Sequence, residues 1–322
     1  MIRILKLATT LILACGCATA SAQAYPTKPI RLVVGFTPGG AADFVARALG
    51  EPLGRALGQS IVIENRAGAG SSIAADYVAK SAPDGYTMLI ASPSSISVNP
   101  ALNPKLGYSL RDLTPITKVS ASPLLIAANP GIGVGSIKEL IAAAKKAPGK
   151  LNYASSGNGS APHLAGVLFN RLAGIDIVHV PFKGGGPSVQ SVLAGDTQVT
   201  FATPPSVLPL VQAGRLRALA VTSRARSPLL PDLPGMQEAG LGEYEMSFWY
   251  GIFVPAGTKP EIVKKLFDAI TSTLQQPALK QAFAREATEA VGSRSPEDFA
   301  AFLAEDDKFW VRLVKESGAT LD

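Results

Sequence analysis

Residues 31–49, RLVVGFTPGGAADFVARAL, predict a strand that passes through a glycine turn directly into a helix. The apolar run from Leu32 to Val34 suits a short buried strand, and apolar residues recur at helical spacing from Ala41 onward. Gly39 and Gly40 stand at the corner, where the missing side chains let backbone approach a ligand closely. Because the first helical turn has free amides, this corner suits a carboxylate or a phosphate. A tight turn that binds nothing shows the same pattern.

Residues 151–172, LNYASSGNGSAPHLAGVLFNRL, repeat this plan farther along the chain. A short strand leads into a loop made almost entirely of Ser, Gly and Asn, and a helix begins near Pro162, a residue suited to a first helical position. Two such corners indicate two facing lobes. If both helix N-termini point into one cleft, their amides and hydroxyls can hold opposite sides of one small anion.

The rest of the chain alternates strands with helices, which is typical of parallel α/β sheets. Further strands are predicted at 60–64, 86–91, 116–119, 124–128, 175–180, 197–202, 218–222 and 248–254. Ser92 and Ser94 follow the strand at 86–91, at the end where open α/β sheets bind ligands. Two series joined near residues 126 and 247 predict a chain that crosses twice between lobes. Trp249, at the second crossing, is expected to report closure of the cleft, whereas Trp310 in the terminal helix is expected to be uninvolved.

Residues 1–24 have the layout of a secretory signal peptide: two basic residues, an apolar core and small residues that end in Ala22-Gln23-Ala24. The mature protein is therefore expected to be soluble and exported. A second interpretation is a lipoprotein box at residues 12–15, which would leave a lipidated Cys15 and a membrane tether.

Cys15 and Cys17 are the chain's two cysteines, so cleavage after Ala24 predicts a protein without disulfides or a Cys-based metal site. The leader carries two of the 30 basic residues and none of the 24 acidic ones, which leaves a mature charge of 28 minus 24, or +4. The basic residues neither cluster nor alternate with aromatic residues, so a nucleic-acid partner is not expected. The remaining length predicts two domains.

Several ordered motifs resemble the Bug family of extracytoplasmic solute receptors, the TctC-like binding subunits of tripartite tricarboxylate transporters. They are FTPGGAAD at 36–43, ENRAGAG at 64–70, APDGYT at 82–87, NYASSG at 152–157, HLAG at 163–166, VPFKG at 180–184 and LRALAV at 216–221. The resemblance implies an α/β, two-lobed periplasmic binding protein of type II (Venus flytrap) with two Rossmann-like lobes and a double hinge crossing. With the crossings that spacing predicts near 126 and 247, the expected lobes are 25–126 plus 248–322, and 127–247.

The resemblance also implies a function: a monomer without cofactor or metal binds a small organic carboxylate in the periplasm and passes it to membrane permease subunits. The ligand could be a di- or tricarboxylate or an aromatic acid, and the resemblance does not decide between them. The loops that match Phe36–Asp43 and Ser155–His163 would grip one carboxylate, partly through ordered water. Ala202 stands where relatives often carry Asp, which makes an amino-acid ligand less favourable. The expected ligand-binding residues are Phe36, Gly39, Gly40, Ala41, Asp43, Ser92, Ser94, Ser155, Ser156, Gly157, Ser160, Ala161, His163, Phe182 and Thr203.

Several of these residues also have a structural interpretation. Asp43, on the first turn of its helix, suits a dipole-compensating cap, and it could serve an anion only through water or loop amides. His163 is either a donor to the anion or a histidine satisfied at its helix start. Phe36 and Phe182 are either pocket walls or core, and Lys183 is either a solvated turn residue or a ligand partner.

Two other function classes stay open from the residues. Ser160 and His163 suggest a hydrolase, but the chain has no G-x-S-x-G elbow and only two histidines. A ligand sensor would present its closed state to a signalling receptor instead of a permease. Neighbouring genes for a permease or for a sensor kinase would separate transport from sensing.

Overall fold

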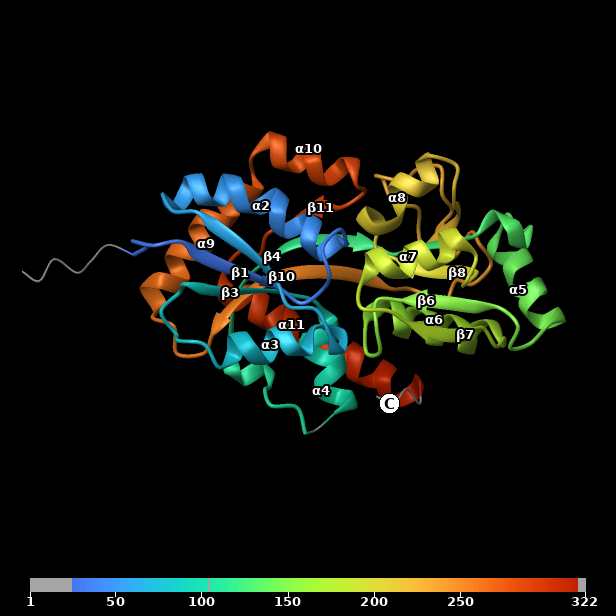
Figure 1. The fold of residues 1–322 in the computed structure, drawn as a ribbon, viewed down its shortest axis with the longest axis horizontal. Helices are drawn as coiled ribbons and strands as arrows, with labels where there is room; N and C mark the ends of the chain where they lie inside the picture. The colour runs from blue at the N-terminus through green and yellow to red at the C-terminus, as the bar shows by residue number, and fades with distance from the viewer. Residues whose placement is uncertain (1–24, 104, 318–322) are drawn as a thin grey trace, which may run out of the picture.

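The computed structural model describes residues 25–103 and 105–317, which form two β-sheets with helices packed against them (Figure 1). The strands are β1 (Ile30–Val34), β2 (Ile61–Asn65), β3 (Thr87–Ala91), β4 (Leu113–Pro123), β5 (Leu125–Ala128), β6 (Asn152–Ser155), β7 (Val178–Pro181), β8 (Val199–Ala202), β9 (Arg217–Val221), β10 (Ser247–Pro255) and β11 (Glu289–Ala290). The helices are α2 (Ala41–Leu57), α3 (Ser72–Ala79), α4 (Asn99–Leu102), α5 (Ile137–Lys146), α6 (Ala161–Ala173), α7 (Gly185–Ala194), α8 (Pro204–Gln212), α9 (Pro260–Leu274), α10 (Pro277–Arg285) and α11 (Pro296–Ser317).

Both sheets are mixed. The larger has the order β11-β4-β10-β3-β1-β2 and the smaller the order β7-β6-β8-β5-β9. β1 runs parallel to β2 and β3, and β6 runs parallel to β7 and β8, as the βα rhythm predicts. β10 is antiparallel to β3 and β4, and β5 is antiparallel to β8 and β9. The parallel pairing predicted from the βα rhythm holds for β1–β3 and β6–β8 but not for the whole of either sheet, because β5 and β10 each enter their sheet directly from the other sheet instead of through a helical crossover.

The chain changes sheet at two adjacent places. It leaves β4 and enters β5 at Leu124, and it returns to the larger sheet after Met246, where Ser247 pairs with Pro123. The hydroxyl of Thr222, which is fully buried, accepts a hydrogen bond from the Leu124 amide and donates one to the Met246 carbonyl, both at 2.8 Å. One side chain thus ties the two crossings together. The lobe bounds at 126 and 247 stay a prediction.

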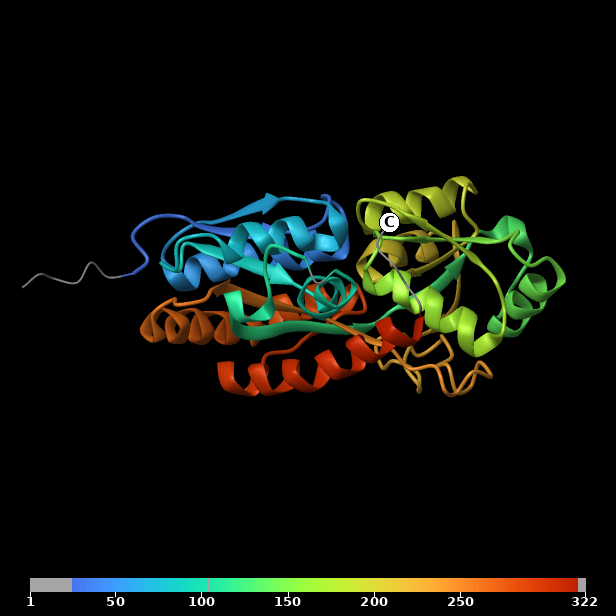
Figure 2. The same cartoon turned by 90° about the horizontal axis from the view of Figure 1, so that it is seen from below.

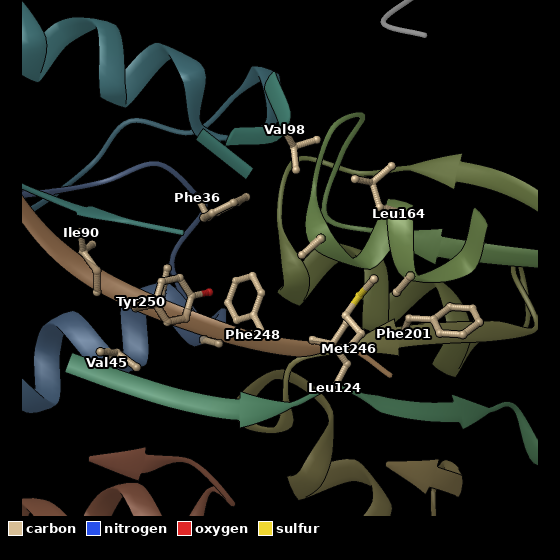
Figure 3. Close-up of a cluster of buried hydrophobic side chains, with 14 of the residues drawn as sticks. Phe36, Val45, Ile90, Val98, Leu124, Leu164, Phe201, Met246, Phe248 and Tyr250 are labelled. Atoms are coloured by element: carbon tan, nitrogen blue, oxygen red, sulfur yellow. The ribbon is translucent and has the colours of Figure 1, made fainter. Parts of the chain in front are cut away.

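Side chains on β10 alternate between two faces. Phe248 and Tyr250 lie in one hydrophobic cluster, drawn in Figure 3, while Trp249 packs in another against Phe299 of α11 at a ring distance of 5.7 Å. The indoles of Trp249 and Trp310 both donate to Oδ2 of Asp306, at 2.8 and 2.9 Å. The two tryptophans therefore share one acceptor, although they belong to different hydrophobic clusters. The expected contrast between a reporting Trp249 and an uninvolved Trp310 stays a prediction.

Helix α11 runs beneath the half that holds the larger sheet and ends near the other half (Figure 2). There Glu316 accepts a hydrogen bond from Arg171 of α6 at 2.9 Å. None of the helices in 25–103 and 105–317 combines the length and the apolar character needed to cross a bilayer. The predicted signal peptide and Cys15 lie outside the described residues.

Candidate functional site

A cavity lies between the two sheets and takes its walls from both. About 420 Å³ there holds no protein atoms when the space open to solvent is included, but the room for a water molecule is only about 20 Å³, so the walls lie close together. The lining residues are Phe36, Gly40, Ala41, Ala42, Ser94, Ser156, Pro162, Gly185, Ser188, Thr200, Ala202, Thr203, Ser206, Phe248 and Tyr250.

Four helices begin at this cavity. First-turn or capping residues of α2, α6, α7 and α8 line it, among them Ala41, Pro162, Gly185 and Thr203. The first amides of a helix have no acceptor within the helix and carry a partial positive charge. Helix α8 begins with two prolines, which have no N–H, and the Ala161 and His163 amides of α6 already donate to serine hydroxyls, so α2 and α7 are the better placed to donate to a ligand. None of the lining residues is an Asp, Glu, His, Lys or Arg. The positive potential of the cavity therefore comes from backbone, which is an arrangement that binds anions.

The loop at 36–40 is held by side chains outside the cavity. Asn65 donates from Nδ2 to the Phe36 carbonyl and to Oδ1 of Asp43, both at 3.0 Å. Oδ2 of Asp43 accepts from the Gly39 amide at 3.1 Å and from Nε of Arg47 at 2.9 Å. Burial raises the pKa of Asp43, but the hydrogen bonds from Arg47, Gly39 and Asn65 outweigh it and the pKa is lowered. Asp43 does not line the cavity, and its geometry is that of a residue that fixes the loop.

Each half of the molecule provides an acceptor for the first amide of a helix in the other half. Oγ of Ser206, on α8, accepts from the Ala41 amide of α2 at 3.2 Å. Oγ of Ser94, after β3, accepts from the Ala161 amide of α6 at 3.1 Å. The two hydrogen bonds run in opposite directions across the cavity, so both depend on the lobes being closed.

Two glycine positions show how closely the halves approach. A Cβ at Gly184, where φ is +145°, would lie 2.5 Å from Oγ1 and 3.3 Å from the backbone nitrogen of Thr37 in the other half, so a side chain there would require Thr37 or the halves to move. A Cβ at Gly40 would lie 3.7 Å from the Gly185 nitrogen, which is ordinary contact. Gly40 therefore leaves room for one methyl group and for little more.

The second corner is fixed by a buried serine and two histidines. Oγ of Ser155 lies 2.6 Å from Nε2 of His179 and accepts from the Gly157 amide at 3.1 Å. The His163 and His179 rings stack at 4.0 Å. Burial, with a smaller contribution from His163, lowers the pKa of His179 to about 3, so His179 is neutral at physiological pH. The pair supports the loop that starts at Ser155 and does not line the cavity.

His163 is satisfied at the start of α6. Its Nδ1 accepts from the Gly159 amide at 3.2 Å, and its own amide donates to Oγ of Ser160, the N-cap residue, at 3.3 Å. This is the arrangement of a histidine that shapes the corner.

A second cavity opens beside the first. Its volume is about 250 Å³, and it shares Phe36 and Ser156 with the first cavity. Residues 68–71, 157–158 and 181–183 form its remaining walls, so Phe182 and Lys183 both line it.

The expected site residues divide into three groups. Phe36, Gly40, Ala41, Ser94, Ser156 and Thr203 line the first cavity, whereas Gly157 and Phe182 line only the second. Gly39, Asp43, Ser92, Ser155, Ser160, Ala161 and His163 line neither. The sequence analysis missed Ala42, Pro162, Gly185, Ser188, Thr200, Ser206, Phe248 and Tyr250 as wall residues, and it treated Ala202 only as a departure from the family.

The missed residues carried weak signals. Gly185 lies in a glycine turn and Ser206 follows a Thr-Pro-Pro turn, the same βα-corner pattern that identified α2 and α6. Phe248 and Tyr250 alternate with Trp249 in an apolar strand, and sequence does not show which face of such a strand meets a cavity.

The comparisons with known proteins agree with this geometry. A family model described as "Tripartite tricarboxylate transporter family receptor" matches residues 45–319. Protein BugT of Bordetella pertussis is 39% identical over 324 residues, which cover 100% of this chain and 99% of BugT.

Three solved structures share the fold over nearly their whole length. A structure described as a periplasmic transporter has a TM-score of 0.89 and 38% identity, covering 93% of this chain and 100% of that one. An R. palustris protein solved with adipate has a TM-score of 0.89 and 35% identity, and the match covers 92% of this chain and 100% of that one. MatC from Rhodopseudomonas palustris, solved with bound malate, has a TM-score of 0.85 and 31% identity, covering 90% and 100%. The chain therefore belongs to the TctC or Bug family of extracytoplasmic solute receptors, which bind solutes and are not enzymes.

Proposed function

We propose that this protein captures a small organic carboxylate in the cavity between its sheets and delivers it to the membrane permease of a tripartite tricarboxylate transporter. One observation carries the proposal: four helix N-termini meet at a cavity whose walls contain no charged side chain. Backbone amides with a partial positive charge favour a carboxylate over a neutral ligand. The adipate and malate bound by two relatives are ligands of this class.

The cavity walls also argue against an amino acid. A ligand ammonium group needs a carboxylate or several carbonyl acceptors, and no Asp or Glu lines either cavity. Ala202, at the end of β8, contributes only a methyl group. This supports an organic acid without an amine.

The remaining parts of the proposal concern place and partner. We propose that the protein acts as a monomer in the periplasm, exported by residues 1–24, with the lobes 25–126 plus 248–322 and 127–247 closing on the ligand. Anchoring through Cys15 is the alternative for its attachment. The family supports a transporter as its partner.

A thermal-shift panel of organic acids and their matching primary amides tests the carboxylate. Binding stabilises the folded protein by about 2.7 kcal/mol when the ligand is at 100 times its dissociation constant. An acid that raises the melting temperature while its amide does not supports the proposal. Equal shifts for both members of every pair would contradict it. Uptake of the labelled acid, lost when the permease genes are deleted, would separate transport from sensing.

A further inference from the structure

Tyr250 presents a buried hydroxyl to the cavity without a protein partner. The side chain lines the cavity and is only 6% exposed. Within residues 25–103 and 105–317, no hydrogen bond is formed by its hydroxyl, and its ring contact is with Phe248, edge to face at 4.9 Å. Figure 3 shows the hydroxyl pointing away from Ile90 and toward Phe248, on the side where the other half of the molecule lies.

The other fully buried or nearly buried tyrosines show what is unusual here. Tyr244 donates to the Ala165 carbonyl at 3.0 Å, Tyr153 to the His163 carbonyl at 3.0 Å and Tyr108 to the Ser95 carbonyl at 2.7 Å. A buried tyrosine hydroxyl ordinarily finds such a partner, because leaving it unpaired costs free energy. Tyr250 differs from them in facing a cavity, so a bound molecule can supply the missing acceptor.

The surroundings define the kind of group that fits. Burial raises the pKa of Tyr250 well above its ordinary value, so the phenol stays protonated and can donate. Phe36 and Phe248 line the same cavity and offer apolar contact, while the helix N-termini provide the positive potential. A ligand carboxylate at the helix ends thus leaves the rest of the ligand among the aromatic side chains, with one donor available there.

We propose that Tyr250 determines specificity: its hydroxyl donates to an acceptor oxygen that the ligand carries away from its first carboxylate. The preferred ligands are carboxylates with a hydroxyl, a carbonyl or a second carboxylate at that position, over acids that end in plain hydrocarbon. This inference rests on the proposed function, since it assumes a carboxylate in the cavity.

The test uses two sets of acids matched in length: butyrate, 4-hydroxybutyrate and succinate, and hexanoate, 6-hydroxyhexanoate and adipate. Calorimetric affinities are measured for the mature wild-type protein, for Tyr250→Phe and for Tyr244→Phe. Wild type should bind an oxygen-bearing acid about 3- to 10-fold more tightly than its hydrocarbon match, as expected for one hydrogen bond. Tyr250→Phe should lose this preference and keep its affinity for the hydrocarbon acid and its melting temperature.

Tyr244→Phe is the matched control, because it removes a buried hydroxyl that bonds to Ala165 outside the cavity. It should lower the melting temperature and keep the ligand preference. If Tyr250→Phe loses the preference for the hydroxy acid, the ligand atom that accepts from Tyr250 is a neutral oxygen. If Tyr250→Phe loses the preference for the diacid, that atom belongs to a second carboxylate. If an acid binds and Tyr250→Phe keeps the full preference, the role of Tyr250 is refuted while the proposed function stands. If no acid binds any of the three proteins, the proposed function fails and this inference fails with it.

Discussion

The hydrogen bonds from Ala41 to Ser206 and from Ala161 to Ser94 predict how strongly the protein favours its closed state. Both cross the cavity, at 3.2 and 3.1 Å. When the lobes open, water replaces each serine, so the net contribution of each bond to closure is that of a neutral hydrogen bond, about 1 kcal/mol. Removing both hydroxyls should therefore shift the equilibrium between closed and open forms by about 2 kcal/mol, or roughly 30-fold.

The perturbation is the double variant Ser94→Ala, Ser206→Ala, with Ser188→Ala as its matched control. Ser188 also lines the cavity, but its Oγ donates to the Gly185 carbonyl of its own helix at 2.9 Å and so does not join the halves. All three substitutions remove a cavity hydroxyl, and only the first two remove a bond between lobes. The comparison separates closure from direct contact with ligand.

The assay is pulsed electron paramagnetic resonance on the ligand-free protein. Spin labels at Lys145→Cys in α5 and Glu261→Cys in α9 use exposed positions in different halves of a mature chain that has no other cysteine. The double variant should show a larger population at long distances, and its apparent dissociation constant should rise by up to the same factor. An unchanged distance distribution in the double variant, or an equal change in Ser188→Ala, would refute the role of these bonds in closure.

Two further predictions follow from single positions. Gly40→Ala should bind ligand nearly as well as wild type, because a Cβ there meets the Gly185 nitrogen at an ordinary contact distance of 3.7 Å. Gly40→Val should weaken binding by about tenfold or more, because it adds methyl groups between the halves. Calorimetry measures both affinities, and equal affinities for the two variants would contradict the prediction. His179 has a folded-state pKa of about 3 against an ordinary value of 6.5, so the unfolded chain binds more protons between these values and stability should fall as pH drops from about 6.5 toward 3. Urea unfolding at pH 7 and pH 5 should show a smaller loss for His179→Gln than for wild type, and equal losses would contradict this assignment.

The two corners at 36–43 and 155–163 could be predicted because the signals are local. A strand, a glycine or serine turn and a helix lie within about 20 residues, and the amides that matter belong to the turn itself. Ser92 shows the limit of this reasoning, since the strand end pointed to both Ser92 and Ser94 and could not tell which of them lies in the wall. The chain makes a π-helical turn at Ser94–Val98 directly after β3, which brings Ser94 to the cavity and leaves Ser92 buried behind it.

Contacts between distant segments could not be predicted from local sequence patterns. Ser206 reaches the Ala41 amide across 165 residues, and only the closed arrangement of the halves creates the pair. Asp43 looked like a cap or a water-mediated contact, and its bonds to Asn65 and Arg47 show that it holds the loop. The same holds for His163 and Ser155, whose partners lie within the corner or on β7. Residue types that suit an anion site also suit the scaffold around it, and only geometry separates the two.

The position of Phe248 and Tyr250 on β10 links ligand contact to the motion of the lobes. Both residues follow directly after the crossing at Met246, which Thr222 ties to the crossing at Leu124. Under the proposed function, a ligand that contacts these side chains while its carboxylate meets the start of α7 would touch the larger sheet and the smaller half at once. It therefore stabilises the closed state by its contacts with both halves, which an open cleft cannot provide together. We therefore expect a substitution on this part of β10 to change which ligand can make both sets of contacts, without altering the helix N-termini that are proposed to bind the carboxylate.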